Sequence, residues 1–568
     1  MLAQINSSND SASVINFPRD TTLKETNRIL RYLAPLAVQL DGTAAGYKAT
    51  MRRWFIDNGA LEADADQLTA LCDKWYTITR TPWHGWVTFS KATAVSNGTK
   101  GGDNASLTCA PSTDTVSGKD DYAGLPLFAC VDCNFIVDPE TKEPQITAIA
   151  GITDNFRRHS PDHFVGVLQM SGYFYTTEND TSYTEGYSSL VNLPYANIAP
   201  LDEAIRPSGN VRPWVVHSKY FNHTVNGKLT SYAGVIPTAR NISHNTLHTL
   251  AAATGVGYSG GTTADDAFLK IMLHIKYASL SSDNIVVGCC ANNSQCTAKV
   301  SETAVKRVVL SEADGANFEV GMGVYIGTNE SNDRWQANTY SISGDAGAVI
   351  TAVTPVTISG ANYTAVYVDT DSAFDTVADT TLITTYHWTN GSTDCVLGND
   401  GSPKSNTSGK YPGKIQGIEF MQGGYEVFAD VILKLYKESD GTYWYEPYVC
   451  RDTAKFATSI TADYKASGVK LLQPAAANWY YIKRLGYKKG VFFPIDITGA
   501  SSSTYVRDAC YALAATEGIR EWLARGSLDF GVSNVGLSSI RGYSGVSIAY
   551  WYFVGRLSPN GNRGEWAG

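Results

Sequence analysis

Short runs of alternating apolar and polar residues recur through most of the chain and predict a fold built mainly of β-strands. Between residues 87 and 240, runs such as HFVGVLQMSGYFYTT and RPWVVHSKYF are separated by Gly, Asn, Asp and Pro. This arrangement is typical of strands joined by long loops. Within it, the pair Asn226 and Gly227 separates two polar runs and predicts a β-hairpin turn.

Five stretches instead repeat apolar residues at the spacing of an α-helix. A Thr followed three residues later by an acidic residue predicts the start of two of these helices, at Thr22 and at Thr263. The helix that begins near Thr263 presents one apolar face, which contains Phe268 and Ile271. The five predicted helices cover about residues 22–34, 60–76, 243–254, 263–278 and 506–517.

This order of elements predicts an α+β, β-rich fold in four parts. Residues 1–86 form an N-terminal helical module, and residues 87–240 form a β-rich domain. Residues 241–301 and 391–568 together form a discontinuous domain in which a helix pair packs on a β-sheet. Residues 302–390 contain short strands without a helical pattern, and we expect them to form an inserted small β-barrel or sandwich.

Composition narrows the class of protein. Only 17% of the 568 residues are charged, whereas 11% are aromatic, which suits a loop-rich extracellular or virion protein. The net charge of −9 disfavours nucleic acid as a partner. The chain starts without a basic region followed by an apolar run, so we expect no Sec signal. We expect no membrane insertion, because the most apolar helix carries Lys270, His274 and Lys276.

The ten cysteines fall into two clusters and several isolated positions. Cys130 and Cys133 form one cluster, and Cys289, Cys290 and Cys296 form the other. Four thiolates from two such clusters could hold zinc, but the spacing matches no standard zinc finger. We therefore expect buried free thiols, no metal and no cofactor.

The stretch from Arg525 to Arg563, which we call the terminal segment, differs from the rest of the chain in its residue types. It contains no Lys, Glu, Gln or Met, and is rich in Ser, Gly, Tyr, Val and Asn around the single Trp551. Tyr and Phe provide rigid contact area, while Ser, Asn and Gly provide adaptable hydrogen bonds, as in antibody paratopes. The structural alternative is a Gly- and Ser-rich terminal β-region with surface aromatics.

The same set of residue types has a genetic interpretation. Randomising the two adenines of the Asn codon AAC yields fifteen amino acids and never Lys, Glu, Gln, Met or Trp. Every residue of the terminal segment except Trp551 belongs to that set. We therefore expect Trp551 to be a fixed residue that packs inward, with Tyr543, Ile548 and Tyr550 exposed.

The ends of the terminal segment carry a family resemblance. Arg525, Gly526 and Ser527 at its start, and Gly555 and Arg556 near its end, resemble the two ends found in C-type-lectin-like domains of the formylglycine-generating-enzyme subtype. That subtype includes the variable proteins of phage diversity-generating retroelements, such as the major tropism determinant. The resemblance covers about residues 240–300 and 395–568, and is specific only at the C-terminal end.

The resemblance implies a bacteriophage receptor-binding protein at a tail or fibre tip. The composition, together with the expected lack of an export signal, fits a virion component assembled in the host cytoplasm. The resemblance also implies a homotrimer, attachment to other tail proteins through the N-terminal module, and a host bacterial surface receptor, protein or glycan. The residues expected to form the receptor-binding face are Leu528, Asp529, Phe530, Val532, Ser533, Asn534, Ile540, Arg541, Tyr543, Ser544, Ile548, Tyr550 and Tyr552.

Two other classes of protein remain open at this point. One is a tail-associated polysaccharide-degrading enzyme, for which Glu419 and Asp430 are candidate carboxylates. The other is a bacterial lectin-like adhesin. The oxidase activity of the formylglycine-generating type requires a cysteine pair, and Arg525 to Arg556 contains no Cys. We therefore expect binding without catalysis.

Overall fold

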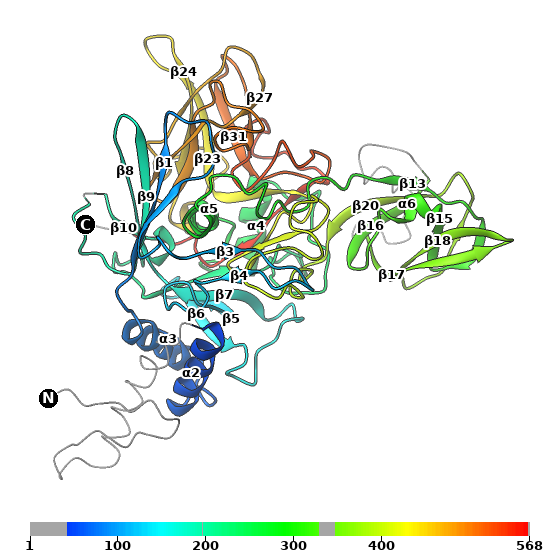
Figure 1. The fold of residues 1–568 in the computed structure, drawn as a ribbon, viewed down its shortest axis with the longest axis horizontal. Coiled ribbons are helices and arrows are strands. Elements are labelled where there is room, and N and C mark those ends of the chain that lie inside the picture. The colour runs from blue at the N-terminus through cyan, green and yellow to red at the C-terminus, as the bar shows by residue number, and fades with distance from the viewer. Residues whose placement is uncertain (1–42, 196, 329–346, 566–568) are drawn as a thin grey trace.

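The computed structural model describes residues 43–195, 197–328 and 347–565. In these residues strands far outnumber helices (Figure 1), which confirms the prediction of a β-rich α+β fold. The helix predicted at residues 22–34 lies outside the described residues.

Two antiparallel sheets form the first half of the described chain. The first has the strand order β10-β8-β9-β1-β2, with β10 (Ala199–Pro200), β8 (Tyr173–Glu178), β9 (Ser182–Ser188), β1 (His84–Ser90) and β2 (Thr99–Gly102). The second has the order β11-β7-β5-β6, with β11 (Trp214–Ser218), β7 (Phe164–Met170), β5 (Cys130–Val137) and β6 (Pro144–Ile149). Burial alternates along β1 but is continuous along β11, so the second sheet is covered on both faces at β11.

The largest sheet has nine strands and belongs to the C-terminal half. Its main path is β25 (Lys465–Ala466), β24 (Tyr443–Val449), β23 (Tyr425–Lys437), β31 (Gly518–Ala524), β32 (Ile540–Arg541), β30 (Ala509–Ala512) and β27 (Asn478–Tyr481). Two further strands join it, β26 (Leu471–Leu472) beside β24 and β33 (Phe553–Val554) beside β23. The long strand β23 is buried over most of its length and forms the spine of this half.

A six-stranded sheet projects from the rest of the molecule, at the right in Figure 1. Its order is β13 (Gln295–Thr297), β20 (Leu382–Trp388), β16 (Met322–Gly327), β17 (Ala348–Ile358), β18 (Ala361–Val368) and β15 (Arg307–Leu310). The residues here have no helical pattern, yet a single helical turn, α6 (Glu312–Gly315), precedes β16. Four-residue helices carry too little periodicity to be recognised.

Five two-stranded pairs complete the β-structure. They are β3 (Cys109–Ala110) with β4 (Lys119–Asp120), β12 (Ser259–Gly260) with β34 (Leu557–Ser558), β14 (Glu302–Val305) with β19 (Phe374–Thr376), β21 (Gly413–Ile415) with β22 (Ile418–Phe420), and β28 (Arg484–Lys488) with β29 (Val491–Asp496). The predicted hairpin is confirmed: Val225 and Lys228 form a bridge, and Asn226 and Gly227 both have positive φ between them.

Three predicted helices are present. They are α3 (Ala65–Ile78), α4 (His244–Thr254) and α5 (Thr263–Tyr277). The start of α5 was predicted one residue late, because the capping residue is Thr262 and its partner is Asp265. The helix α2 (Ala44–Asp57) was not predicted; its buried residues include Tyr47, Met51 and Trp54.

The predicted helix near residues 506–517 is wrong. Val506, Cys510 and Leu513 have helical spacing, but Ala509–Ala512 form strand β30, which pairs with β27 on one edge and β32 on the other. Backbone pairing with two neighbouring strands overrides the local apolar period here.

One hydrophobic core extends from Tyr47 to Leu557 and joins α2, α3 and the sheets of both halves. A second core fills the six-stranded sheet and includes Trp551 of the terminal segment. Helix α5 lies near the centre of the molecule (Figure 1) and is buried on every side, not on one apolar face as predicted. The division into four domains stays a prediction.

Candidate binding surface

The terminal segment leaves and re-enters the largest sheet beside one residue of β23. Strand β31 ends at Ala524, which pairs with Glu426, and the returning strand β33 pairs Val554 with the same Glu426. Because a strand has two hydrogen-bonding edges, β31 and β33 occupy opposite edges of β23 at this position. Both stems of the segment are therefore fixed to the spine of the sheet.

The side chain of Glu426 strengthens this arrangement. Arg525 at the start of the segment places Nη1 2.5 Å from one carboxylate oxygen, and Arg556 near its end places Nε 3.0 Å from the other. Arg525 also lies 3.4 Å from Asp266 of α5. All four side chains are at most 2% exposed. Charge-assisted hydrogen bonds of this kind are strong and directional, so the carboxylate clamps the two ends together.

The final arginine of the segment is held in the same way. Arg563 Nε lies 2.8 Å from Asp202 and Nη2 lies 2.7 Å from Asp430, and all three side chains are buried. Three buried arginines thus anchor the segment to α5, β23 and the short 3-10 helix η2 (Asp202–Ala204). These contacts form a rigid frame at the ends of the segment.

Ten of the thirteen predicted face residues reach solvent. Those that are exposed are Asp529, Val532, Ser533, Tyr543, Ile548 and Tyr550, and those that are partly buried are Phe530, Asn534, Arg541 and Tyr552. Among the described residues, the exposed large hydrophobic side chains include only two aromatic ones, Tyr543 at 48% and Tyr550 at 43%. Exposed apolar side chains that gather in one patch often mark an interaction site, so this face is the candidate binding surface.

The prediction of an exposed face is wrong for three residues, Leu528, Ile540 and Ser544. They are buried and are not part of the face. Ile540 belongs to β32, which lies inside the sheet between β30 and β31. Leu528 packs in the second core, and its backbone bonds to Gly423 and Asn292. The carbonyl of Ser544 accepts a hydrogen bond from Glu521 N. Composition alone could not separate these residues from their exposed neighbours.

Trp551 is buried, at 5% exposure, as the codon argument predicts. Its carbonyl oxygen accepts a hydrogen bond from His387 Nε2 at 3.0 Å, and its ring lies 6.3 Å from that of Tyr386. Burial lowers the pKa of His387 to about 4, which keeps the imidazole neutral. Tyr386 and His387 both belong to β20, so the six-stranded sheet contacts the buried side of the terminal segment.

The exposed Tyr543 also lines a concavity of about 360 Å³. Arg541 lines this concavity, and its guanidinium carbon lies 5.5 Å from the ring centre of Tyr543 and 5.9 Å from that of Tyr552. The rings of Tyr552 and Tyr550 stack at 5.3 Å. Asp529 lines the same concavity and supplies a carboxylate. The surface therefore offers aromatic faces, one cation and one anion to a ligand.

The predicted face lacks three residues that line this concavity: Ser527 of the terminal segment, and two residues outside the segment, Trp479 and Tyr511. Trp479 and Tyr511 lie on the neighbouring strands β27 and β30, and their rings contact each other at 5.5 Å. Trp479 also contacts Phe530 at 5.1 Å, and Tyr511 contacts Tyr543 at 5.5 Å. The run NWYYIKR marks an aromatic strand, but only the sheet order places it beside the terminal segment.

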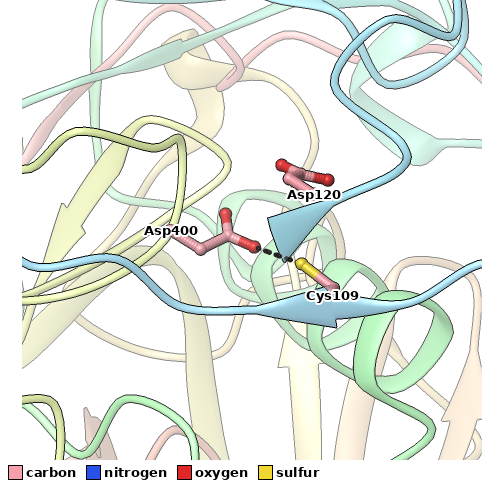
Figure 2. Close-up of side chains that lie close together, drawn as sticks. All are labelled: Cys109, Asp120 and Asp400. Atoms are coloured by element: carbon pink, nitrogen blue, oxygen red, sulfur yellow. Dashed lines mark hydrogen bonds between the residues drawn. The ribbon is translucent and has the colours of Figure 1, made fainter. Parts of the chain in front are cut away.

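A possible metal-ligand group lies elsewhere, formed by Cys109, Asp120 and Asp400 (Figure 2). Its ligand atoms lie within 4.8 Å of one another. However, Lys276 Nζ lies 2.6 Å from Asp400 and 3.1 Å from Asp120, and so takes the place of a cation. Burial also raises the pKa of Cys109, which disfavours the thiolate that a metal requires. The group is better explained as a buried ion-pair cluster.

The remaining candidates for chemistry are structural. Cys130 and Cys133 are buried, and burial raises the pKa of Cys130 to about 11. Glu419 is fully buried and accepts hydrogen bonds from Thr393 N at 2.9 Å and from Gln422 Nε2 at 2.6 Å. Asp430, the second candidate carboxylate of the polysaccharide-degrading enzyme, forms an ion pair with Arg563. Both carboxylates are therefore fully buried and held by other protein groups.

No helix among the described residues is long and apolar enough to span a membrane. Comparison with protein-family models and with curated proteins gives no match to this chain.

Proposed function

We propose that this chain is a bacteriophage receptor-binding protein whose terminal segment binds a molecule on the bacterial surface. The observation that carries the proposal is the contrast within the segment. Residues reachable from the AAC codon, such as Tyr543, Ile548 and Tyr550, face solvent, whereas the unreachable Trp551 is buried. A fixed frame with interchangeable exposed side chains is the arrangement that a diversified binding surface requires.

The family resemblance extends the proposal. It implies a C-type-lectin-like domain for residues 241–301 and 391–568, a homotrimer, and attachment to other tail proteins through residues 1–86. The proposal also includes assembly in the host cytoplasm. Several weak surfaces on one particle gain effective affinity through multivalency, which suits a shallow face with few aromatic anchors.

Adsorption to intact bacteria tests the binding proposal. Fluorescently labelled protein is incubated with a panel of strains, and binding is measured by flow cytometry. The double variant Tyr543→Ser and Tyr550→Ser should lose at least ten-fold in adsorption to a strain that binds the parent. Leu472→Ser is the matched control, because Leu472 is 51% exposed on β26 outside the face.

Two outcomes would contradict the proposal. Equal adsorption by the double variant and the parent would show that binding uses another surface. Release of soluble sugars from the bacterial envelope, abolished by one carboxylate substitution, would favour the polysaccharide-degrading enzyme instead. Diversification is tested separately on the DNA: a near-copy of the region that encodes residues 525–563, differing only at adenines and beside a reverse-transcriptase gene, is expected.

A further inference from the structure

A second cavity, of about 470 Å³, lies between α2 and the central sheets, far along the chain from the terminal segment. Its wall includes Lys48 and Arg52 of α2, Lys219, Lys414 of β21, and a single acidic residue, Asp132. Four cations and one carboxylate thus surround one cavity, in a protein whose net charge is −9. Such local excess charge requires an explanation.

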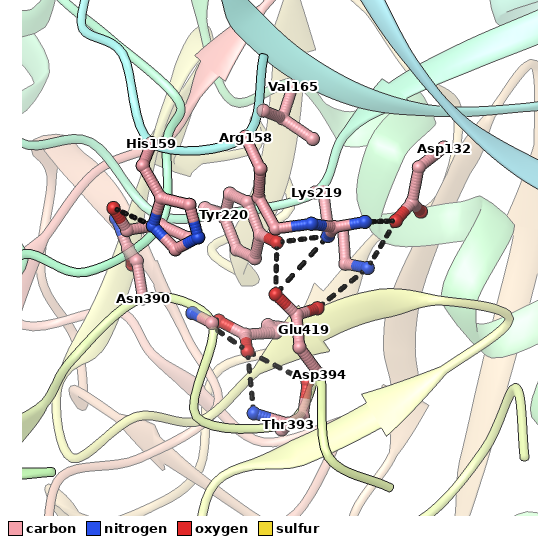
Figure 3. Close-up of polar contacts among 12 residues, drawn as sticks. Asp132, Arg158, His159, Val165, Lys219, Tyr220, Asn390, Thr393, Asp394 and Glu419 are labelled. Carbon is pink, nitrogen blue, oxygen red and sulfur yellow. Dashed lines mark hydrogen bonds and ion pairs between the residues drawn. The ribbon is translucent and has the colours of Figure 1, made fainter. Parts of the chain in front are cut away.

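Asp132 and Lys219 are already neutralised by their neighbours. Figure 3 shows Lys219 between Asp132 and Asp394, with Nζ 2.8 Å from each carboxylate. Arg158 completes the group, since Nη2 lies 2.6 Å from Asp132 and Nη1 lies 3.2 Å from Asp394. The charges of these two cations and two carboxylates therefore cancel, and Asp132 does not neutralise the other cations of the cavity.

Lys414 has no such partner. Its side chain is buried, at 5% exposure, and its Nζ donates only to Val396 O at 3.3 Å. No carboxylate of the described residues lies within 4.0 Å of it. Burial, followed by the charge of Lys219, lowers the pKa of Lys414. The nearby carboxylate of Glu419 is occupied by backbone and side-chain donors, including Thr393 (Figure 3).

Lys48 and Arg52 of α2, which are both exposed to solvent, add two more cations to the lining of the cavity. They are four residues apart on α2 and therefore lie on the same face of the helix. Arg52 Nε donates to Gly151 O at 2.8 Å, which holds the guanidinium against the cavity wall. Neither side chain forms an ion pair with a described residue. Three cations of the cavity therefore lack a counter-ion.

We propose that this cavity binds a small oxyanion, a molecule that carries phosphate or carboxylate groups. An arginine fork and two lysines provide the donors that such groups prefer. The buried ammonium of Lys414 is unfavourable without a ligand and becomes favourable when an anion pairs with it. The volume is in the range of sites for small molecules. This proposal is independent of the receptor-binding function of the terminal segment.

Isothermal titration calorimetry at low salt tests the proposal, with pyrophosphate and glucuronate as separate probes for phosphate and carboxylate ligands. The parent protein should bind at least one probe, with an affinity that falls as salt rises. Arg52→Ala and Lys414→Met should each weaken binding at least ten-fold. Arg53→Ala is the matched control, because Arg53 is exposed on α2 but does not line the cavity.

A second measurement separates loss of binding from loss of folding. Without a probe, Lys414→Met should raise the thermal midpoint, because it replaces an unpaired buried charge by an apolar side chain of similar length. Absence of binding of both probes to the folded parent would overturn the proposal. Equal affinities of the parent, Arg52→Ala and Lys414→Met would also overturn it, since the anion would then bind elsewhere.

Discussion

Replacing Glu426 by Gln should loosen both ends of the terminal segment at once. The substitution keeps the volume of the side chain but removes the negative charge shared by Arg525 and Arg556. Arg556 retains backbone acceptors at Ser218 and Glu419, whereas Arg525 retains only Asp266, at 3.4 Å. Removing one partner from a buried ion pair costs about 3–5 kcal/mol, because the remaining charge stays buried. We expect a loss of this size in the free energy of unfolding.

Urea denaturation followed by the fluorescence of the 12 tryptophans measures this loss. Glu438→Gln provides the control: it breaks an ion pair with Lys470 at 2.8 Å, near the end of the same strand, with both side chains more than a third exposed. Exposed pairs contribute about 0.2–1 kcal/mol. The clamp hypothesis is refuted if the two variants lose equal stability, or if amide exchange of the terminal segment is unchanged in Glu426→Gln.

Two other substitutions test the frame and its buried charges. Trp551→Ala should lower the free energy of unfolding by about 3–5 kcal/mol, because it leaves a cavity in the second core. Tyr550→Ala, which changes an exposed neighbour, should change the free energy of unfolding by less than about 0.5 kcal/mol. Equal losses for the two variants in urea denaturation would contradict the expected difference. Burial raises the pKa of Glu521 to about 8 from its ordinary value of 4.5, so the folded protein holds a proton that the unfolded chain releases. Stability should therefore fall as the pH rises from about 4.5 to 8, by up to about 1.4 kcal/mol per pH unit from this group. Glu521→Gln should remove that part of the slope, and parallel pH profiles of variant and parent would argue against it.

The helices show how far local pattern predicts structure. Residues of α3 and α4 have helical spacing, and α4 forms where the pattern predicts it, whereas α3 begins at Ala65, after the predicted start at residue 60. Strand β30 has helical spacing too, but it is held by β27 and β32, which lie far away in the sequence. Helix α5 shows the limit in another way: Lys270, His274 and Lys276 would face water on an isolated helix. Lys270 pairs with Asp266 of the same helix, whereas His274 and Lys276 pair with Glu185 and Asp400 from other elements, and these contacts allow the three side chains to be buried.

The terminal segment was recognised from its residue types, but its geometry was not. The codon argument separates Trp551 from its neighbours, and the structure buries that residue. It cannot separate Ile540 from Ile548, because both codons belong to the same set. Only the pairing of β32 inside the sheet buries Ile540. In the same way, the contribution of Trp479 to the concavity depends on the order of strands, which a single sequence does not contain.

The central claim is that a fixed frame presents interchangeable binding residues. Its most direct test is a library in which Val532, Tyr543, Ile548 and Tyr550 are randomised together, scored for protease resistance and for adsorption to the parental strain. The account predicts that most members stay folded and lose adsorption, whereas a library at Leu528, Ile540 and Trp551 loses protease resistance. Exposed-site members that unfold as often as the buried-site members, or that still adsorb like the parent, would contradict it.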